Sequence, residues 1–321
     1  APIVSTQPSW FYVMVVVTVL LLTELKHTFT EFAQRMKNDE MITLAKFLAI
    51  SGIILPMLPH KNLIPDINLT PYSIWLATVV VSGISYLSYL LKRYVFHESG
   101  TLVSGIIGGL YSSTATISVL ARKSRKASEQ EATDYVAAML LAVSMMFLRF
   151  MILILIFSRE IFLSIYPYLL TMAVVAAIVA WFIHSRQKRP ENQSAETEED
   201  DSSNPLEFKV ALIFAVLFVI FTFLTHYTLV YAGTGGLNLL SFVSGFSDIT
   251  PFILNLLQNT GSVAALIITA CSMQAIISNI MVNMFYALFF AGKGSKLRPW
   301  ILGGFGVVIV CNLVLLLFFY I

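Results

Sequence analysis

Asp248 and Arg149 are charged residues within stretches that are otherwise apolar, and they carry the most informative chemistry in the sequence. Asp248 lies in GLNLLSFVSGFSDITPFILNLLQ, residues 236–258, and Arg149 lies in MMFLRFMIL, residues 145–153. A charge without a partner at membrane depth is costly, so each residue needs a counter-charge, a bound ion or a proton. Two interpretations are open. The pair forms a buried salt bridge that fixes helix packing, or it exchanges partners during transport, with Asp248 taking a cation or proton.

Hydroxyl and amide side chains accompany these charges. In the run GGLYSSTAT, residues 108–116, hydroxyl side chains follow two glycines, so oxygens could coordinate a hard cation or hydroxyls could donate to an anion. Asn279 and Asn283 are four residues apart and share one helix face. For any single hydroxyl the alternative is close helix packing with bonds to local carbonyls. These residues predict a polar site only as a group.

The composition identifies the solvent around these residues. The chain has 321 residues, of which 57% are hydrophobic and 12% charged, and its mean hydropathy is +0.81. Soluble domains carry about 25% charged residues, so this chain is predicted to lie mainly in lipid. A net charge of +2 excludes a polybasic nucleic-acid-binding protein, and two cysteines without a CxxC spacing exclude a thiolate metal site.

Apolar stretches of about 20 residues each span a bilayer, so the sequence predicts an all-α polytopic membrane protein. Eight stretches read as continuous helices, and two, 100–121 and 236–258, are interrupted by glycine, proline or polar residues. Such interruptions are tolerated only where protein or water satisfies the backbone, so both segments are predicted to be broken or re-entrant. The ten stretches are 9–25, 42–58, 73–94, 100–121, 135–158, 160–183, 208–232, 236–258, 261–291 and 298–321.

The distribution of Lys and Arg tests this topology, because cytoplasmic loops are enriched in them. Ten full crossings give ten basic residues on one side and nine on the other. If the two interrupted segments are re-entrant, seventeen lie inside and only Lys61 and Arg159 lie outside. The re-entrant topology is therefore favoured, although broken helices that cross the membrane stay open as an alternative.

A weak internal repeat favours a transporter architecture. Val-Ser-Gly occurs at 103–105 and 243–245, and Ala-x-Ser-Met follows at 142–145 and 270–273. Three crossings separate the two units, which makes them inverted, as in secondary transporters with broken helices at the midplane. We expect two N-terminal transmembrane helices in 1–60, a first repeat in 61–183, an acidic linker in 184–206 and a second repeat in 207–321. The linker is interpreted as disordered, with cation sensing as the alternative.

Enzyme mechanisms lack their required residues. An intramembrane aspartyl protease needs two facing acids, and Asp248 is the one acid that lies well inside an apolar segment. There is no HExxH motif for zinc and no GxxxxGK[ST] motif for nucleotide phosphates. We therefore expect no catalytic residue and no cofactor, and leave the metal unknown.

Three sequence runs resemble a known family. NLTPYSIWLATVVVSGISYLSYLLKRY (68–94), GLYSSTATISVLARKSR (109–125) and ILPMLP (54–59) resemble the C-terminal membrane domain of unknown function (domain of unknown function 4010) of MgtC/SapB-like bacterial membrane proteins. The family pattern has two acids two residues apart in the second broken segment and a lysine in a later helix. Here Asp248 matches the first acid, while Thr250 and Asn283 occupy the other positions. The resemblance implies a multi-pass protein of the bacterial inner (plasma) membrane and leaves the substrate open.

The predicted function is secondary transport of an ion or small polar solute through a polar midplane site. The alternative is a regulatory or assembly protein of the same group, whose polar residues only stabilise packing. The expected partners are the lipid bilayer, an ion or small polar solute and possibly further copies of the chain, with no nucleic acid. The candidate substrate-binding or coupling residues are Asp248, Arg149, Ser112, Ser113, Thr114, Thr116, Thr250, Asn279 and Asn283.

The topology is testable by cysteine labelling. Glu98→Cys and Glu129→Cys flank the first interrupted segment, so both should react with a membrane-impermeant maleimide from the cytoplasmic side. Arg159→Cys should react from the opposite side. Labelling of residues 98 and 129 from opposite sides would show that segment 100–121 crosses the membrane.

Overall fold

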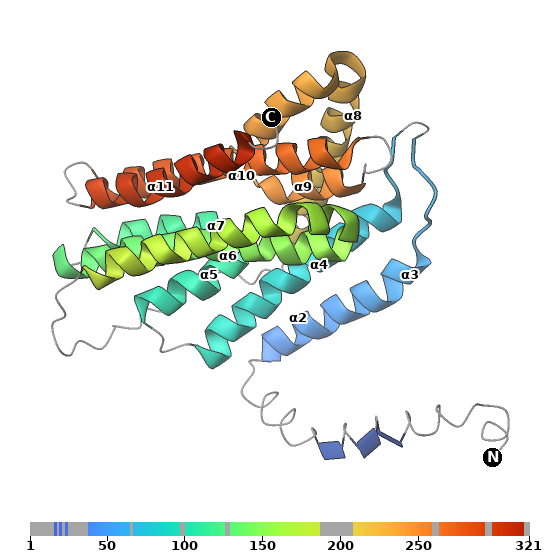
Figure 1. Cartoon of the computed structure of the whole chain (residues 1–321). Coiled ribbons are helices and arrows are strands. Elements are labelled where there is room, and N and C mark those ends of the chain that lie inside the picture. The colour runs from blue at the N-terminus through green and yellow to red at the C-terminus, as the bar shows by residue number, and fades with distance from the viewer. Residues whose placement is uncertain are drawn as a thin grey trace. The chain divides into compact units, whose positions relative to one another are not determined.

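The computed structural model describes residues 16–17, 19–20, 23–24, 38–64, 67–96, 100–125, 129–186, 208–258, 263–292 and 297–317. Eight helices in these ranges are long and apolar enough to cross a membrane, and no strand occurs among them (Figure 1). The predicted all-α polytopic fold is confirmed. The predicted helix 9–25 lies outside the described residues apart from the six residues given above, and so does the predicted linker from residue 187 onward.

Two compact units divide the chain at residues 52 and 53. The first contains α2 (Asn38–Ala49), and a π-helical turn, η1 (Ile50–Ile54), includes the boundary. The second unit begins with that turn and the short α3 (Leu55–Met57), which ends ahead of Pro59. Because proline has no N–H and restricts the residue before it, it accounts for the end of the predicted 42–58 helix.

The remaining helices of the second unit follow the predicted apolar stretches. Local caps set some of their ends: Thr70 and Ser73 form a reciprocal capping box at the start of α4, and Ser158 accepts from the N–H of Ile161 at the start of α7. The elements are α4 (Pro71–Leu90), η2 (Leu91–Val95), α5 (Thr101–Lys123), α6 (Glu129–Phe157), α7 (Arg159–Ser185), α8 (Phe208–Ser244), α9 (Ile249–Gln258), α10 (Ala265–Ala291) and α11 (Arg298–Leu317).

A glycine divides α8 where the sequence predicts a boundary. A straight helix of 37 residues would be about 55 Å long, well beyond a hydrocarbon layer of about 30 Å. At Gly233 the backbone has φ 60° and ψ −153°, a conformation that favours glycine. Residues 208–232 therefore form one long helix, and residues 234–244 belong to the second interrupted segment.

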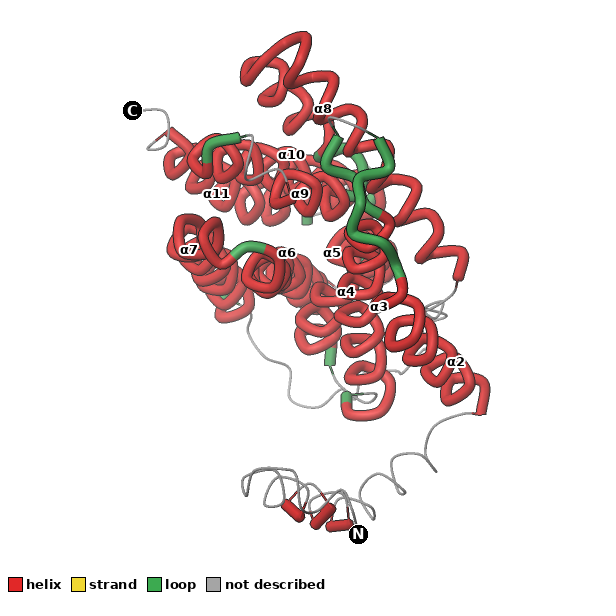
Figure 2. The backbone as a smooth tube through the Cα atoms, turned by 90° about the vertical axis from the view of Figure 1, so that its right-hand side faces the viewer, coloured by secondary structure: helices red, strands yellow, loops and turns green. Residues whose placement is uncertain are grey.

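Contacts between the two halves of the second unit follow a two-fold pattern. Figure 2 shows α10 and α11 over α6 and α7. The packed pairs are α5 with α10, α9 with α6, α6 with α11, α10 with α7, α4 with α8 and α7 with α11. If each of α4–α7 is exchanged for its counterpart in α8–α11, in order, the same set of packed pairs results. The pair α5 with α10, for example, becomes α9 with α6. Two related repeats would pack in this way, and their inversion across the membrane stays a prediction.

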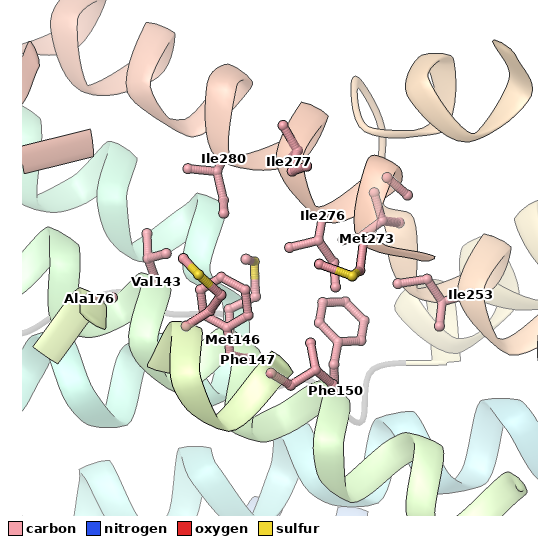
Figure 3. Close-up of a cluster of buried hydrophobic side chains, with 14 of the residues drawn as sticks. Val143, Met146, Phe147, Phe150, Ala176, Ile253, Met273, Ile276, Ile277 and Ile280 are labelled. Atoms are coloured by element: carbon pink, nitrogen blue, oxygen red, sulfur yellow. The ribbon is translucent and has the colours of Figure 1, made fainter. Parts of the chain in front are cut away.

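Apolar side chains fill the space between α6 and α10. The cluster is buried, and its α6 members point toward those of α10, with Ile253 of α9 beside them (Figure 3). Burial of such side chains against each other keeps the two repeats in contact through packing, because lipid offers no hydrophobic drive for association. The facing residues are Val143, Met146, Phe147 and Phe150 on α6 and Met273, Ile276, Ile277 and Ile280 on α10.

Small residues bring α5 against α6. A Cβ at Gly105 would lie 2.3 Å from the carbonyl oxygen of Ala138, and one at Gly109 would lie 2.5 Å from Cα of Ala142. Both contacts are with backbone, which cannot move aside as a flexible side chain would. The i and i+4 spacing on both helices is the small-residue packing typical of transmembrane helices.

Gly105→Ala is expected to destabilise the protein by about 1–3 kcal/mol, because its methyl group would separate α5 from α6. Gly303→Ala on α11 is the matched control. A Cβ at Gly303 would have no atom within 4 Å, so we expect no loss and a gain of up to about 1 kcal/mol. Unfolding of the purified variants in detergent measures both. Equal stability of the two variants would contradict the proposed close approach.

Candidate functional site

The first helix interruption lies within α5, at Ser112. Its backbone is extended, with φ −158° and ψ 107°, and it separates Thr101–Tyr111 from Ser113–Lys123. Ser112 Oγ accepts from the N–H of Ala115 at 3.3 Å, so the hydroxyl caps the second half-helix. The predicted interruption of segment 100–121 is confirmed. The residue with non-helical backbone is Ser112, whereas Gly105 and Gly109 pack against α6.

The two halves of α5 approach each other next to this break. A Cβ on Gly108, in the first half, would lie 2.5 Å from Oγ1 of Thr116, in the second. Residues 108 and 116 of a continuous helix would be about 12 Å apart along its axis, so the chain must turn sharply between them. Gly108 therefore permits the turn, and Thr116 serves as its packing partner.

Arg149 connects α6 to this break. One terminal nitrogen of its guanidinium donates to the carbonyl oxygen of Tyr111, the last residue before the interruption, at 2.9 Å. This bond satisfies a carbonyl group that the broken helix leaves without its usual partner. Nε of Arg149 is shielded from solvent and has no hydrogen-bond partner. Asp248 supplies the main favourable charge acting on the guanidinium.

The second interruption lies between α8 and α9, at residues 245–248. Asp248 is exposed at this turn, and its Oδ1 accepts from the N–H of Thr250 at 2.9 Å, so the carboxylate caps α9. Pro251 follows in the first turn, where its missing N–H breaks no helical bond. The predicted interruption of segment 236–258 is confirmed.

Asp248 and Arg149 do not form a direct salt bridge. Both residues are among those that the structure describes, and they are not paired within 4 Å, whereas His184 and Asp134 are, at 2.6 Å. The interpretation of a packing salt bridge is therefore wrong in its direct form. The carboxylate is held by the α9 N-terminus instead, at a distance from which its charge still acts on Arg149.

Helix α10 supports the second break through its amide side chains. Nδ2 of Asn279 donates to the carbonyl oxygen of Gly245 at 3.3 Å, and Nδ2 of Asn283 donates to Oδ1 of Asn279 at 3.1 Å. Ser278 packs directly on the same glycine, because a Cβ there would lie 2.3 Å from Ser278 Oγ. Asn279 and Asn283 thus lie on one helix face, as predicted. Asn283 donates to Asn279, and Asn279 donates to the Gly245 carbonyl at the break.

The sequence-predicted residues fall into two groups, one around each break. Arg149, on α6, bonds at the first break and is acted on by the charge at the second. Thr114 contributes its carbonyl oxygen to Oγ of Ser118 at 2.8 Å. The first group is Ser112, Ser113, Thr114, Thr116 and Arg149, and the second is Asp248, Thr250, Asn279 and Asn283.

Several contacts of the site were missed from the sequence. Backbone carbonyls of Tyr111 and Gly245 accept the key hydrogen bonds, and a carbonyl has no residue-type signal. Ser278 was recognisable as a polar neighbour of Asn279, but not as the residue that contacts the break. Elsewhere in the described helices, Asn255 of α9 donates to Oγ1 of Thr222 of α8 at 2.7 Å, which ties the second segment to its preceding helix.

Some buried polar atoms around the second repeat have no hydrogen-bond partner. They include Oγ of Ser278, Oδ1 of Asn283, Oγ1 of Thr269 and Oγ1 of Thr225. Native interiors leave few such atoms, so each indicates a bound solvent molecule, a ligand or a functional constraint. Over the described residues no group of three His, Cys, Asp or Glu side chains could hold a metal ion. Any cation here would have to use carbonyl, amide and hydroxyl oxygens.

Comparison with known proteins identifies similar sequences and no similar structure. The profile of a family described as Domain of unknown function (DUF4010) matches residues 79–291. A protein of Aquifex aeolicus (strain VF5), described as "Uncharacterized protein", is 25% identical over 227 residues, which cover 69% of this chain and 96% of that protein. No solved structure matches.

Asn279→Ala is expected to lower the free energy of unfolding by about 1–3 kcal/mol, because the buried Asn283 amide and the Gly245 carbonyl both lose their partner. Asn312→Ala is the control, since this buried amide donates to the carbonyl of Val308 in its own helix, at 3.2 Å. Its loss should stay below about 1 kcal/mol. Denaturant unfolding in detergent compares them, and equal losses would show that Asn279 does not support the break.

Proposed function

This chain belongs to the family described as Domain of unknown function (DUF4010), and from that premise we propose that it is a secondary transporter of an ion or small polar solute. The family description assigns no activity, so the proposal depends on geometry. The observation that carries it is the pair of interrupted helices, one with Arg149 bonded to the carbonyl before its break and the other with Asp248 capping the helix after its break. Secondary transporters use such helices to bind solutes.

Interrupted helices are costly unless they serve a purpose. Each break leaves N–H and C=O groups without intrahelical partners, and hydrocarbon cannot satisfy them. In this protein side chains satisfy only some of these groups: Arg149 bonds one carbonyl and Asn279 bonds another. At the second break the N–H groups of residues 245–247 bond to carbonyls three residues earlier, and the hydroxyls of Ser244 and Ser247 bond locally as well. A solute could take the place of such local partners, which supports a binding site at the breaks.

The arrangement of the repeats supports a mechanism of alternating access. The contacts between halves are related by a two-fold exchange, and each half contains one broken segment. An apolar layer between α6 and α10 separates the halves and forms few directional bonds (Figure 3). A rocking movement across such a layer would expose the breaks alternately to the two sides of the membrane.

The alternative function, a packing role in a regulatory or assembly protein, is less well supported. It predicts that the polar groups at the breaks pair fully with one another. Instead, Nε of Arg149, Oγ of Ser278 and Oδ1 of Asn283 have no protein partner. Unpaired polar atoms contribute nothing to packing and are costly when buried. A solute bound at the breaks would give these atoms partners.

The cellular setting is part of the same proposal. Multi-pass apolar helices place the protein in a lipid bilayer. The bacterial inner membrane is proposed from the MgtC/SapB resemblance of residues 54–59, 68–94 and 109–125. The relation of this chain to MgtC/SapB-like proteins is proposed from the same resemblance, and assembly into homo-oligomers is a separate proposal.

Asp248→Asn tests the transport proposal. The amide keeps the size of the side chain and can still accept from Thr250 N–H, but it removes the charge that acts on Arg149. We expect folding to be retained and solute flux to fall at least about tenfold. Flux is measured in reconstituted vesicles over alkali cations, divalent cations and small anions, for whichever solute the unmodified protein moves.

Glu160→Gln is the matched control, because Glu160 is an exposed acid in the first turn of α7. Its flux should equal that of the unmodified protein. Unchanged flux in Asp248→Asn would remove this carboxylate from the mechanism. Absence of flux for every solute in the unmodified protein would reject transport itself.

A further inference from the structure

We infer that the transported solute carries an oxyanion group, a carboxylate or phosphate, which binds between the Arg149 guanidinium and the N-terminal end of the second half of α5. This inference rests on the proposed transport function and specifies the charge of the transported solute. Four features of the described residues support it: an incompletely paired guanidinium, a half-helix N-terminus beside it, a carboxylate committed elsewhere, and the lack of a charged set that would hold a cation.

Arg149 has more donors than the protein satisfies. A guanidinium has five N–H groups in a planar fork that matches two oxygens of a carboxylate or phosphate. One terminal nitrogen donates to the Tyr111 carbonyl, and Nε, which is shielded from solvent, has no partner. No carboxylate of the described chain lies within 4 Å of it. The Arg149 guanidinium is therefore a cation with a buried N–H donor, at Nε, that an anionic oxygen could satisfy.

The second half of α5 begins at the same place. Ser113 follows Ser112 directly, and the half-helix continues for 11 residues to Lys123. The first N–H groups of a helix have no acceptor within the helix, and the helix dipole adds partial positive charge there. Ser112 Oγ satisfies the N–H of Ala115 but contributes no negative charge. This half-helix therefore begins two residues after Tyr111, whose carbonyl the guanidinium contacts.

The second break shows what the first one lacks. At the start of α9, Asp248 provides a carboxylate that accepts from Thr250 N–H at 2.9 Å. At the corresponding place in α5 the cap is the neutral Ser112, and Arg149 adds a positive charge. One half-helix N-terminus therefore has its own anion, and the other has a cation next to it. An incoming oxyanion would balance the first break as Asp248 balances the second.

A cation fits this arrangement poorly. Arg149 and the α5 half-helix N-terminus would both repel it at the first break. At the second break Asp248 offers a carboxylate whose Oδ1 already accepts a hydrogen bond, and the described residues contain no group of three His, Cys, Asp or Glu side chains that could hold a metal ion. The amide and hydroxyl oxygens on α10 are neutral. The positive charge at the first break thus favours a solute with negative charge at that break.

The test measures binding to the purified full chain in detergent, with inorganic phosphate and acetate as separate probes at constant ionic strength. Sodium, potassium and magnesium chlorides serve as cation controls. We expect phosphate or acetate to raise the unfolding temperature in a saturable way, and the cations to have no such effect. The two probes distinguish a phosphate group from a carboxylate group.

Arg149→Gln should weaken binding of the effective probe at least about tenfold, because a charge-assisted hydrogen-bond pair is lost. Arg159→Gln, which changes an exposed arginine at the start of α7, should bind as the unmodified protein does. If Arg149→Gln does not fold, Arg149→Lys provides the measurement. It keeps the charge but loses the planar fork, so binding should again weaken at least about tenfold.

Three results would overturn the inference: saturable binding of neither probe, binding of a cation in their place, or unchanged binding in the Arg149 variants. Flux measurements separate this outcome from failure of the transport proposal. Oxyanion binding without flux in vesicles would reject transport and keep the site. Flux of a cation that is indifferent to both probes would keep transport and reject the oxyanion site.

Discussion

Backbone hydrogen bonding in a medium without water is the constraint on which this structure depends. A helix that breaks within a bilayer exposes carbonyl and amide groups that lipid cannot satisfy. At the break in α5 the protein answers with the Arg149 guanidinium on the Tyr111 carbonyl, and at the break before α9 with the Asn279 amide on the Gly245 carbonyl. The charged and polar side chains on α6 and α10 are therefore located by the breaks that they serve.

Close packing is the condition for these bonds. A side chain on α6 reaches the α5 break only because glycines on α5 allow backbone contact with Ala138 and Ala142. Likewise, Gly245 brings the second break against Ser278 and the backbone N of Asn279. Small residues thus determine where the helices meet, and polar residues at these places form the hydrogen bonds to the breaks. This division explains why glycine is frequent near both interruptions without being the residue that breaks α5.

The sequence predicts the helices well and the site contacts only in part. Apolar length is imposed by the bilayer, so stretches such as 160–183 and 298–321 correspond to helices within a few residues. Glycine and polar content locate both interrupted segments for the same reason. The position of the α5 break at Ser112, the bond to the Tyr111 carbonyl and the absence of a direct Asp248–Arg149 pair depend on three-dimensional packing. Residue types alone do not encode carbonyl partners.

The two breaks are alike in construction and opposite in charge, and this asymmetry matters for function. Two similar repeats that pack about a two-fold axis would present two equivalent sites to a solute. Arg149 at one break and Asp248 at the other remove that equivalence. Under the proposed transport function, a solute of one sign would be attracted to one break and repelled from the other, which would give it a single preferred place of binding. The two charges also act on the backbone differently, since Arg149 donates to the carbonyl before one break and Asp248 accepts from an N–H group after the other.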